Sequence, residues 1–142
     1  MKKITLSLVF CTICTLNYAQ TARRQSEMPY SGSFYVVANT AKGQEQINVN
    51  YSLSTPPFVN SVNMQMNTPD PMMMMVKILN LNSETVMNWM PSQKSNRYGH
   101  SFDISNLSAG TYKMEIYGPD SKIAKTINFQ KQAETSQIHS GN

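Results

Sequence analysis

The sequence contains few cysteines and few charged residues, and it lacks the residue clusters that mark most active sites. Its two cysteines, Cys11 and Cys14, fall within the first 20 of 142 residues. Charged residues make up only 14% of the chain, and the two histidines, His100 and His139, lie far apart in the sequence. There is no Gly-rich phosphate loop, no His cluster and no nucleophile elbow. We therefore predict a protein that is not an enzyme and holds no cofactor.

Both cysteines lie in a segment with the pattern of a secretory signal peptide. Two lysines precede an apolar stretch, residues 4–16, and Ala19 provides a small residue near a plausible cleavage point. The stretch is shorter than the roughly 20 apolar residues that cross a bilayer. We therefore favour a cleaved signal over residues 1–20 to a retained membrane anchor. The prediction is an exported protein, periplasmic, cell-surface or secreted, whose mature domain contains no cysteine.

The excess of positive charge is small once this segment is removed. The chain has a formal net charge of +4, and Lys2 and Lys3 leave with the signal. Apart from Arg23 and Arg24, the remaining basic residues stand singly and are not interleaved with stacking aromatic residues. No second apolar run of spanning length follows. We therefore predict no nucleic-acid partner and no stable membrane span after signal removal.

Strand-like segments follow residues 21–32, which are polar and unpatterned and are predicted to form a flexible lead-in. In the clearest segment, Ile47, Val49, Tyr51 and Leu53 alternate with polar residues, as in a strand with one buried face. Other strand-like segments are shorter or less regular, namely 33–38, 62–66, 72–81, 84–90, 98–104, 112–117 and 123–129. Sequences typical of turns separate the segments, at 39–43, 56–57, 68–71, 92–96 and 118–121.

Apolar residues never recur at helical spacing over the length of a helix, so the pattern predicts an all-β fold. We predict an Ig-like antiparallel β-sandwich with Greek-key topology and about seven to eight strands over residues 33–131. A disordered polar tail, 132–142, is expected to follow. Val76, Ile78 and Trp89 are predicted to lie in the core. The apolar phase shifts after Ile78, so this strand is either covered on both faces or reset by a bulge.

A corner before the strand at 112–117 is the most specific structural feature. In Greek-key sandwiches a Tyr near the start of a late strand can donate a hydrogen bond from its hydroxyl to the backbone of the preceding corner. Tyr112 stands at that position, Gly110 suits a tight backbone and Leu107 would fill the core beneath. The alternative is a simple turn followed by a half-buried Tyr112. Both alternatives give Leu107, Gly110 and Tyr112 a structural role.

The methionines are the residues that come closest to indicating a binding site. Many of the 11 methionines lie between Met64 and Met90, and thioether sulfur suits Cu(I). Met64, Met66, Met73 and Met75 are the candidate ligands for such a site. Consecutive strand residues point to opposite faces, however, so the run from Met72 to Met75 cannot converge as a whole. The alternative is that methionine fills the core and faces a partner surface.

Two further functions find little support in the residues. His100 lies on the strand face opposite Ser101 and Asp103, so these three residues cannot form a hydrolytic triad. Carbohydrate binding on a sheet face would need a row of exposed aromatic residues. The tyrosines that could serve are dispersed along the chain, at Tyr30, Tyr35, Tyr98 and Tyr117.

Three stretches of the chain, 76–86, 102–112 and 125–131, together resemble the C-terminal sorting domain of type IX (Por) secretion cargo. That family has a strand ending in an Asn-x-x-Gly-x-x-Val turn, an Asp-Leu-Ser-x-Leu-x-x-Gly-x-Tyr corner and a Lys-rich final strand. The resemblance covers about residues 45–131 and implies an Ig-like sandwich. Ser83 stands where the family usually has Gly, only Thr55-Pro56-Pro57 opens the region, and a polar tail extends beyond 131. After the predicted signal the sandwich makes up nearly all of the sequence, so we expect it without a cargo domain.

From these observations we predict an exported, non-enzymatic sandwich that acts through its surface or its edge strands. Edge strands present unpaired N–H and C=O groups that can add to the sheet of a partner. The predicted partner is a protein of the cell envelope or of the secretion machinery, and the role is either surface sorting or periplasmic interaction. A Met-rich Cu(I)-binding protein is the alternative.

Overall fold

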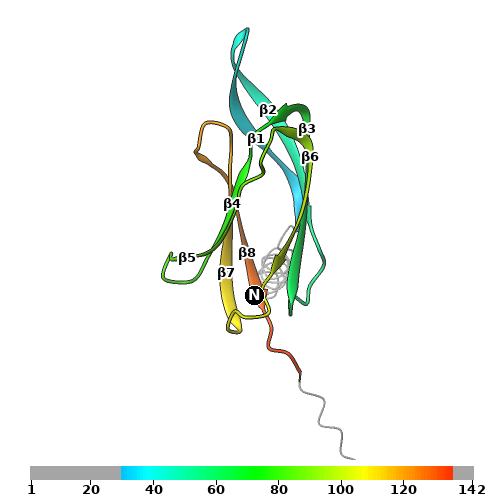
Figure 1. The fold of residues 1–142 in the computed structure, drawn as a ribbon, viewed down its shortest axis with the longest axis vertical. Coiled ribbons are helices and arrows are strands. Elements are labelled where there is room, and N and C mark those ends of the chain that lie inside the picture. The colour runs from blue at the N-terminus through cyan, green and yellow to red at the C-terminus, as the bar shows by residue number, and fades with distance from the viewer. Residues whose placement is uncertain (1–29, 136–142) are drawn as a thin grey trace, which may run out of the picture.

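The computed structural model describes residues 30–135, which form two antiparallel sheets packed face to face (Figure 1). The first sheet has the order β1-β2-β3-β6, with β1 (Ser31–Thr40), β2 (Gly43–Leu53), β3 (Ser61–Met72) and β6 (Ser95–Asp103). The second has the order β5-β4-β7-β8, with β4 (Met75–Leu79), β5 (Thr85–Trp89), β7 (Gly110–Tyr117) and β8 (Ile123–Lys131). The prediction of an all-β Ig-like sandwich is confirmed, with eight strands.

The connections interlock the two sheets. Strands β3 and β6 are neighbours in the first sheet, whereas β4 and β7 are neighbours in the second. The chain therefore crosses between sheets after β3, after β5 and after β6, as in a Greek key. In this part of the chain, residues 30–135, no helix is long and apolar enough to cross a membrane.

Alternating side chains from both sheets fill the space between them. The first sheet contributes Val49, Met64 and Met66, and the second contributes Ile78 and Phe129, all of which are almost completely buried. Val76 is also completely buried, so the predicted core positions at Val76 and Ile78 are confirmed. Methionine suits this role because its unbranched side chain adapts to irregular gaps between the sheets.

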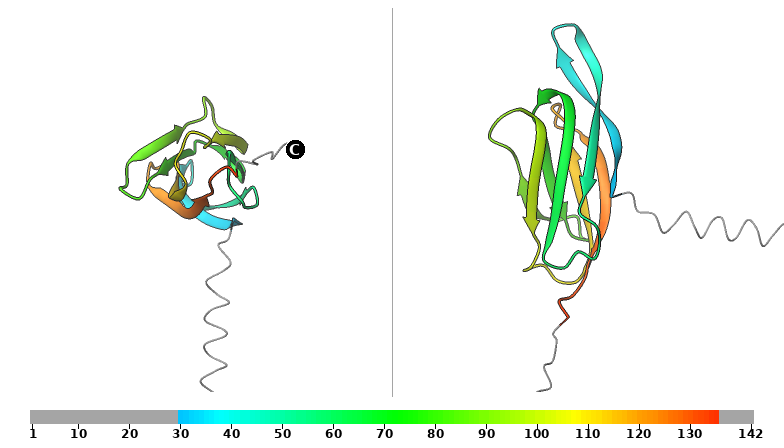
Figure 2. Two further views of the ribbon diagram at one scale, coloured as in Figure 1. Left: turned by 90° about the horizontal axis from the view of Figure 1, so that it is seen from below. Right: turned by 90° about the vertical axis from the view of Figure 1, so that its right-hand side faces the viewer.

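The β1–β2 hairpin extends beyond the rest of the sandwich. Strand β2 pairs with β1 along its length, but it pairs with β3 only from Asn50 to Leu53. Residues 34–49, hereafter the ribbon, therefore form a two-stranded arm that projects past the end of the other strands (Figure 1 and Figure 2, right). The ribbon begins within the core, since Val36 and Val49 are buried, and its tip at Lys42 is exposed.

The predicted turn at 68–71 is wrong, because these residues continue β3. The register between β3 and β6 shifts between Asn67 and Met72, and the Thr68 hydroxyl donates a hydrogen bond to the Asp70 carbonyl at 2.8 Å. Pro69 and Pro71 have no N–H to give to a ladder. The strand therefore leaves β2 at this bulge, and the ribbon is released from the sheet.

The apolar run 72–81 is divided between the two sheets. Met72 ends β3, and β4 begins at Met75 in the opposite sheet. Within β4 the register against β5 shifts between Ile78 and Leu79, so a bulge resets the phase of the apolar residues. Leu81 lies in the following turn and is largely exposed.

The bounds of some strands also differ from those predicted. Ser31 and Gly32 belong to β1 rather than to a lead-in, and β6 begins at Ser95, inside the predicted loop. At the other end, the backbone N–H of Gln132 donates to the Phe58 carbonyl at 2.8 Å. The predicted signal, residues 21–29 of the lead-in and residues 136–142 of the tail lie outside the described residues.

Candidate functional site

The corner that precedes β7 has a hydrogen-bonded tyrosine. The Tyr112 hydroxyl donates to the Ser108 carbonyl at 2.9 Å, and the Tyr112 ring stacks on Phe129 with centroids 5.9 Å apart. The N–H of Leu107 donates to the Ile104 carbonyl at 3.0 Å, and the half-buried Leu107 side chain packs against the core. This geometry is that of a tyrosine corner rather than of a simple turn.

The corner requires glycine at position 110 because of the backbone conformation there, and not because a side chain would lack space. Its φ is +152°, a conformation that L side chains rarely adopt. A Cβ at this position would meet no heavy atom within 4 Å. Glycine is therefore favoured because it alone enters this backbone region without strain.

The turn between β4 and β5 contains Ser83 and is held by the side chain of Asn80. Oδ1 of Asn80 accepts hydrogen bonds from the N–H groups of Asn82 and Glu84 at 2.9 and 3.0 Å, and its Nδ2 donates to Glu84 Oε2 at 2.6 Å. Ser83 has a φ of +63°, in the left-handed region that glycine enters readily. Serine therefore stands in a backbone conformation that strains it and that glycine would adopt freely.

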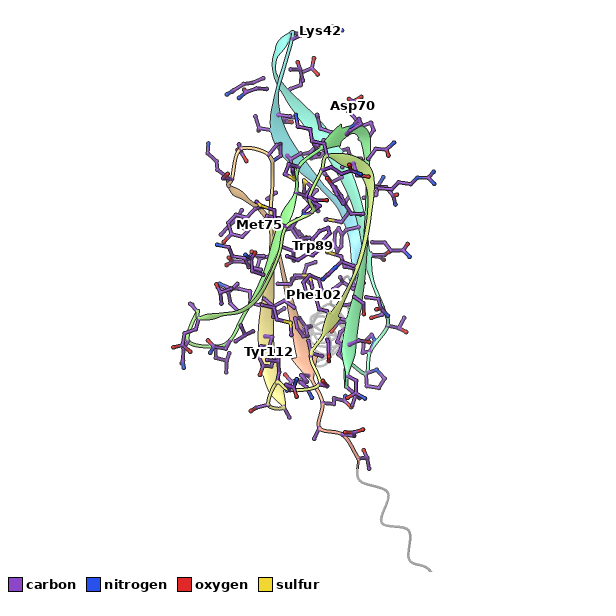
Figure 3. The ribbon with its side chains drawn as sticks, viewed as in Figure 1. Lys42, Asp70, Met75, Trp89, Phe102 and Tyr112 are labelled. Atoms are coloured by element: carbon purple, nitrogen blue, oxygen red, sulfur yellow. The ribbon has the colours of Figure 1, made fainter. Side chains whose placement is uncertain are left out.

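Aromatic rings join the edge strands of the two sheets along one side of the sandwich. The Trp89 ring of β5 stacks on the His100 ring of β6 at 4.8 Å, and the His100 ring contacts Phe102 at 4.6 Å. Figure 3 shows Trp89 and Phe102 between the sheets. Trp89 is only half-buried, and not fully within the core as predicted, because β5 is an edge strand.

This stack gives His100 a structural environment. Burial lowers the pKa of His100, because removal from water disfavours the imidazolium. Ser101 and Asp103 lie on the exposed side of β6, as the alternation predicts, so no triad forms with His100.

The outer edge of β5 presents an apolar, uncharged surface. Residues Thr85–Trp89 carry no charge, and the strand has a hydrogen-bonded neighbour only in β4. Around this edge Leu81 is 79% exposed, Met90 57% and Val86 36%. We call this surface, formed by Leu81, Val86, Met87 and Met90, the β5 edge. Lysine and proline, the residues that usually block strand addition, are absent from β5.

A charged network lies on the outer face of the second sheet. The Tyr117 hydroxyl donates to Glu115 Oε2 at 2.6 Å, and Lys113 Nζ lies 2.9 Å from Glu115 Oε1. The hydrogen bond from Tyr117, opposed in part by burial and assisted by Lys113, lowers the pKa of Glu115. This network was not predicted from the sequence, although the spacing of Lys113, Glu115 and Tyr117 places all three on one strand face.

The four methionines considered for Cu(I) do not share one environment. Met64 and Met66 are buried in the core, whereas Met73 and Met75 are partly exposed where the chain crosses to the second sheet. Within residues 30–135, no group of three or more His, Cys, Asp or Glu side chains is arranged to hold a metal ion.

A groove of about 700 Å³ lies beneath the ribbon. Its walls come from the ribbon, from the β3 bulge and from the turn between β7 and β8. Apolar side chains such as Ile47 and Met73 lie beside Lys42, Asp70 and Lys122 in its lining. The groove therefore carries both signs of charge around an apolar interior.

Comparison with known proteins gives a structural and a family relationship. A solved structure of a DUF3244 family protein with an immunoglobulin-like β-sandwich fold, from Bacteroides vulgatus ATCC 8482, is 21% identical in sequence. The match covers 72% of this chain and 96% of that chain, with a TM-score of 0.44. No curated protein matches the sequence.

The family relationship confirms the resemblance seen in the sequence. Residues 56–130 match the secretion system C-terminal sorting domain. The match contains β3 to β7 and nearly all of β8, including the Tyr112 corner. Membership implies an exported protein that associates with a secretion system. The chain belongs to the secretion system C-terminal sorting domain family.

Proposed function

We propose that this protein is an exported, non-enzymatic sandwich that binds a protein partner in the secretion machinery or cell envelope and is thereby delivered to the cell surface. The observation that carries the proposal is the family match over residues 56–130, which includes most of the sandwich. Periplasmic interaction without surface delivery is the competing role.

The β5 edge is the surface best suited to such a partner. Its backbone offers unpaired N–H and C=O groups, and extended segments of other proteins commonly bind by adding a strand to an open edge. The exposed Val86 and Met90 side chains offer apolar contacts beside that backbone. A partner with an extended segment and apolar side chains at alternate positions would match both features.

The side chains best able to act as acids or bases are engaged in structural contacts, which supports a non-enzymatic role. His100 is held between Trp89 and Phe102, and Glu115 is held by Tyr117 and Lys113. Cu(I) binding is not favoured, because Met64 and Met66 are buried in the core, whereas Met73 and Met75 are partly exposed.

The test is export of the full chain with a reporter inserted between residues 24 and 25. In a host with type IX secretion, we expect the reporter at the cell surface or in the medium, and in an isogenic strain without that machinery in the periplasm. The same fusion without residues 30–142 is expected to remain periplasmic in both strains. Periplasmic retention of the intact fusion in both strains would contradict surface delivery and favour the periplasmic role.

A matched pair of variants tests the β5 edge. Val86 and Val37 are equally exposed valines on edge strands, at 36% and 37%. Val86→Lys places a charge on the proposed docking strand, and we expect surface delivery to fall by about tenfold or more. Val37→Lys adds the same charge to β1 and should leave delivery unchanged. Equal effects of the two substitutions would argue against the β5 edge.

A further inference from the structure

The groove beneath the ribbon follows the free backbone edge of β1. An unbroken run of residues, 37–42, lines it, whereas β2 contributes Glu45 and Ile47 but not Gln46 between them. Consecutive strand residues point to opposite faces, so a groove that touches every residue of a run lies along the backbone edge and not only under one face. Among the strands of residues 30–135, β1 has its hydrogen-bonded neighbour, β2, on the other side. The groove therefore contains backbone N–H and C=O groups of β1 that no strand pairs.

The interior of the groove is apolar and has the size of a small-ligand site. Its volume of about 700 Å³ lies within the range of about 300–1,000 Å³ that is usual for such sites. Ala38 and Ile47 line it from the ribbon, and Pro71 and Met73 line it from the opposite wall. Ala38 and Met73 are half-buried, so parts of both side chains are open to a ligand. These residues suit apolar groups of a ligand.

The charged residues of the groove are balanced in sign, and most of them have no ion-pair partner. Asp120 and Lys122 approach each other at 4.0 Å. Two cations and two carboxylates of the lining make no ion pair within residues 30–135, namely Lys42, Lys94, Glu45 and Asp70. A ligand that carries one charge of each sign is complementary to this set.

The positions of two of these charges suit an extended peptide that runs in the direction of β1. Lys42 lies at the tip of the ribbon and Asp70 nearer its base, and β1 runs toward the tip (Figure 3). A peptide parallel to β1 would point its terminal ammonium toward Asp70 and its terminal carboxylate toward Lys42. The antiparallel direction would bring like charges together. A peptide also has the backbone groups that the free edge of β1 can pair.

We propose that the groove binds a short extended peptide with free ends and apolar side chains, which pairs with β1 from Val37 to Thr40 and runs parallel to it. Extended segments of other proteins commonly bind by adding a strand to an open edge in this way. The site lies on the ribbon, in the opposite sheet from the β5 edge, and is independent of surface delivery.

Titration of the purified full chain with trileucine, followed by NMR of the backbone amides, is the first test. We expect a Kd at or below about 1 mM, the weak end of specific affinities, with the largest shift changes at residues 37–42. C-terminally amidated trileucine should bind about threefold more weakly, within the range of an exposed ion pair. Lys42→Glu should weaken binding of the free peptide and leave that of the amidated peptide unchanged. The absence of saturable binding, or shift changes confined to other strands, overturns the proposal.

Octanoate distinguishes a peptide from a fatty acid in the same groove. It carries an apolar chain and a carboxylate, but neither an ammonium group nor a peptide backbone. We expect it to bind more weakly than trileucine. Tighter binding of octanoate at residues 37–42 would assign the groove to a fatty acid and contradict the proposal.

Two matched pairs of variants test the site itself. Val37→Lys adds a charge that discourages strand addition to β1 and should weaken trileucine binding by about tenfold or more, whereas Val86→Lys, at the β5 edge, should not change it. Ala38→Leu extends a side chain into the groove and should also weaken binding. Ala124→Leu makes the same change at a half-buried alanine of β8 outside the lining and is its control.

Equal effects within the Val37 and Val86 pair contradict the site, whatever the β5 edge does in surface delivery. The amide spectrum of each variant shows whether it is folded. Val37 is exposed on β1, so this first pair decides the test if Ala38→Leu does not fold.

Discussion

The ribbon and the body of the sandwich, strands β3–β8, are built from the same antiparallel pairing but are stabilised differently. In the body, β3, β4 and β7 each have a strand on both sides and a covered inner face. In the ribbon, each strand pairs with one neighbour. Between Ile47 and the tip, at residues 43–46, both faces of β2 are exposed. Two-stranded hairpins are marginally stable alone, so the ribbon depends on the residues it inserts into the core.

The family match follows the same division. Residues 56–130 begin after β2 and end within β8, so the match contains the body and excludes the ribbon. The Tyr112 corner and the Asn80 turn both lie in the body. The family match therefore covers the body, and the projecting ribbon lies outside it.

Truncating matched isoleucines should produce the largest difference between the two regions. Ile78 is completely buried on the central strand β4, and Ile47 is nearly buried on the ribbon. Both Ile→Ala changes remove the same atoms, at a cost within about 2–5 kcal/mol. We expect Ile78→Ala near the upper end, because its tightly packed site cannot collapse, and Ile47→Ala near the lower end. Denaturant unfolding followed by Trp89 fluorescence measures both.

Hydrogen exchange provides the control for this comparison. Ile47→Ala should accelerate exchange mainly at ribbon amides, whereas Ile78→Ala should accelerate it throughout the body. If the two variants lost equal stability and exchanged alike, the ribbon and the body would be one cooperative unit.

Gly110→Ala should have the next largest effect. The side chain would meet no neighbour, so the cost comes from the φ of +152° and is expected to be about 1–3 kcal/mol. Thermal unfolding measures it, with Gly99→Ala as the control, because Gly99 also has open space but no positive φ. Equal loss in both variants would contradict a backbone role for Gly110.

The corner hydrogen bond should contribute less. Tyr112→Phe keeps the ring that stacks on Phe129 and removes the donor to Ser108, at a cost of about 0.5–1.5 kcal/mol. Chemical denaturation of this variant, beside Tyr35→Phe at an exposed ribbon position, separates the bond from the general effect of losing a hydroxyl. If Tyr112→Phe left the free energy of unfolding unchanged, the hydrogen bond to Ser108 would not contribute to the stability of the corner.

Regular alternation and turn chemistry make much of the fold predictable from sequence. The alternation from Ile47 to Leu53 predicts β2, and the residues of the Tyr112 corner predict a Greek-key sandwich. The composition of residues 118–121 predicts a turn, and the Ser121 N–H donates to the Gly118 carbonyl at 3.0 Å across it. These features depend on residues that are close in the sequence, so they can be predicted from a short segment.

Features that depend on distant strands are not predictable in this way. Thr68–Pro71 has the composition of a turn, but pairing with β6 resumes at Met72 and keeps the segment within β3. The size of Trp89 favours a core position, whereas its exposure follows from the edge position of β5. The length of the free ribbon follows from where β3 leaves β2, which no pattern within β1 or β2 encodes.

Ser83→Gly should stabilise the body by a smaller amount. Glycine adopts the φ of +63° without the strain that serine bears, and the expected gain is about 0.5–1 kcal/mol after its greater unfolded-state entropy is counted. The midpoint of thermal unfolding should rise by a few degrees. Ser92→Gly, in a loop without a positive φ, is the control and should not raise it. A destabilised Ser83→Gly would show that the serine makes a compensating contact.

Acid unfolding should reveal the smallest effect, which belongs to the outer face of the second sheet. The hydrogen bond from Tyr117 and the charge of Lys113 lower the pKa of Glu115 below its ordinary value of 4.5. The folded state therefore holds this proton less tightly than the unfolded state. The resulting stabilisation is fully present above pH 4.5 and is lost as the pH falls through the lowered folded pKa.

Glu115→Gln should flatten this part of the stability profile by less than about 1 kcal/mol, because its charged partner Lys113 is 35% exposed and water screens the pair. Urea unfolding between neutral pH and the acid limb measures it. Glu45→Gln removes the same charge from the ribbon and controls for the change in net charge. A profile for Glu115→Gln that superimposes on that of the unaltered protein would show that the carboxylate network adds nothing to the body, and that its packed core alone distinguishes it from the ribbon.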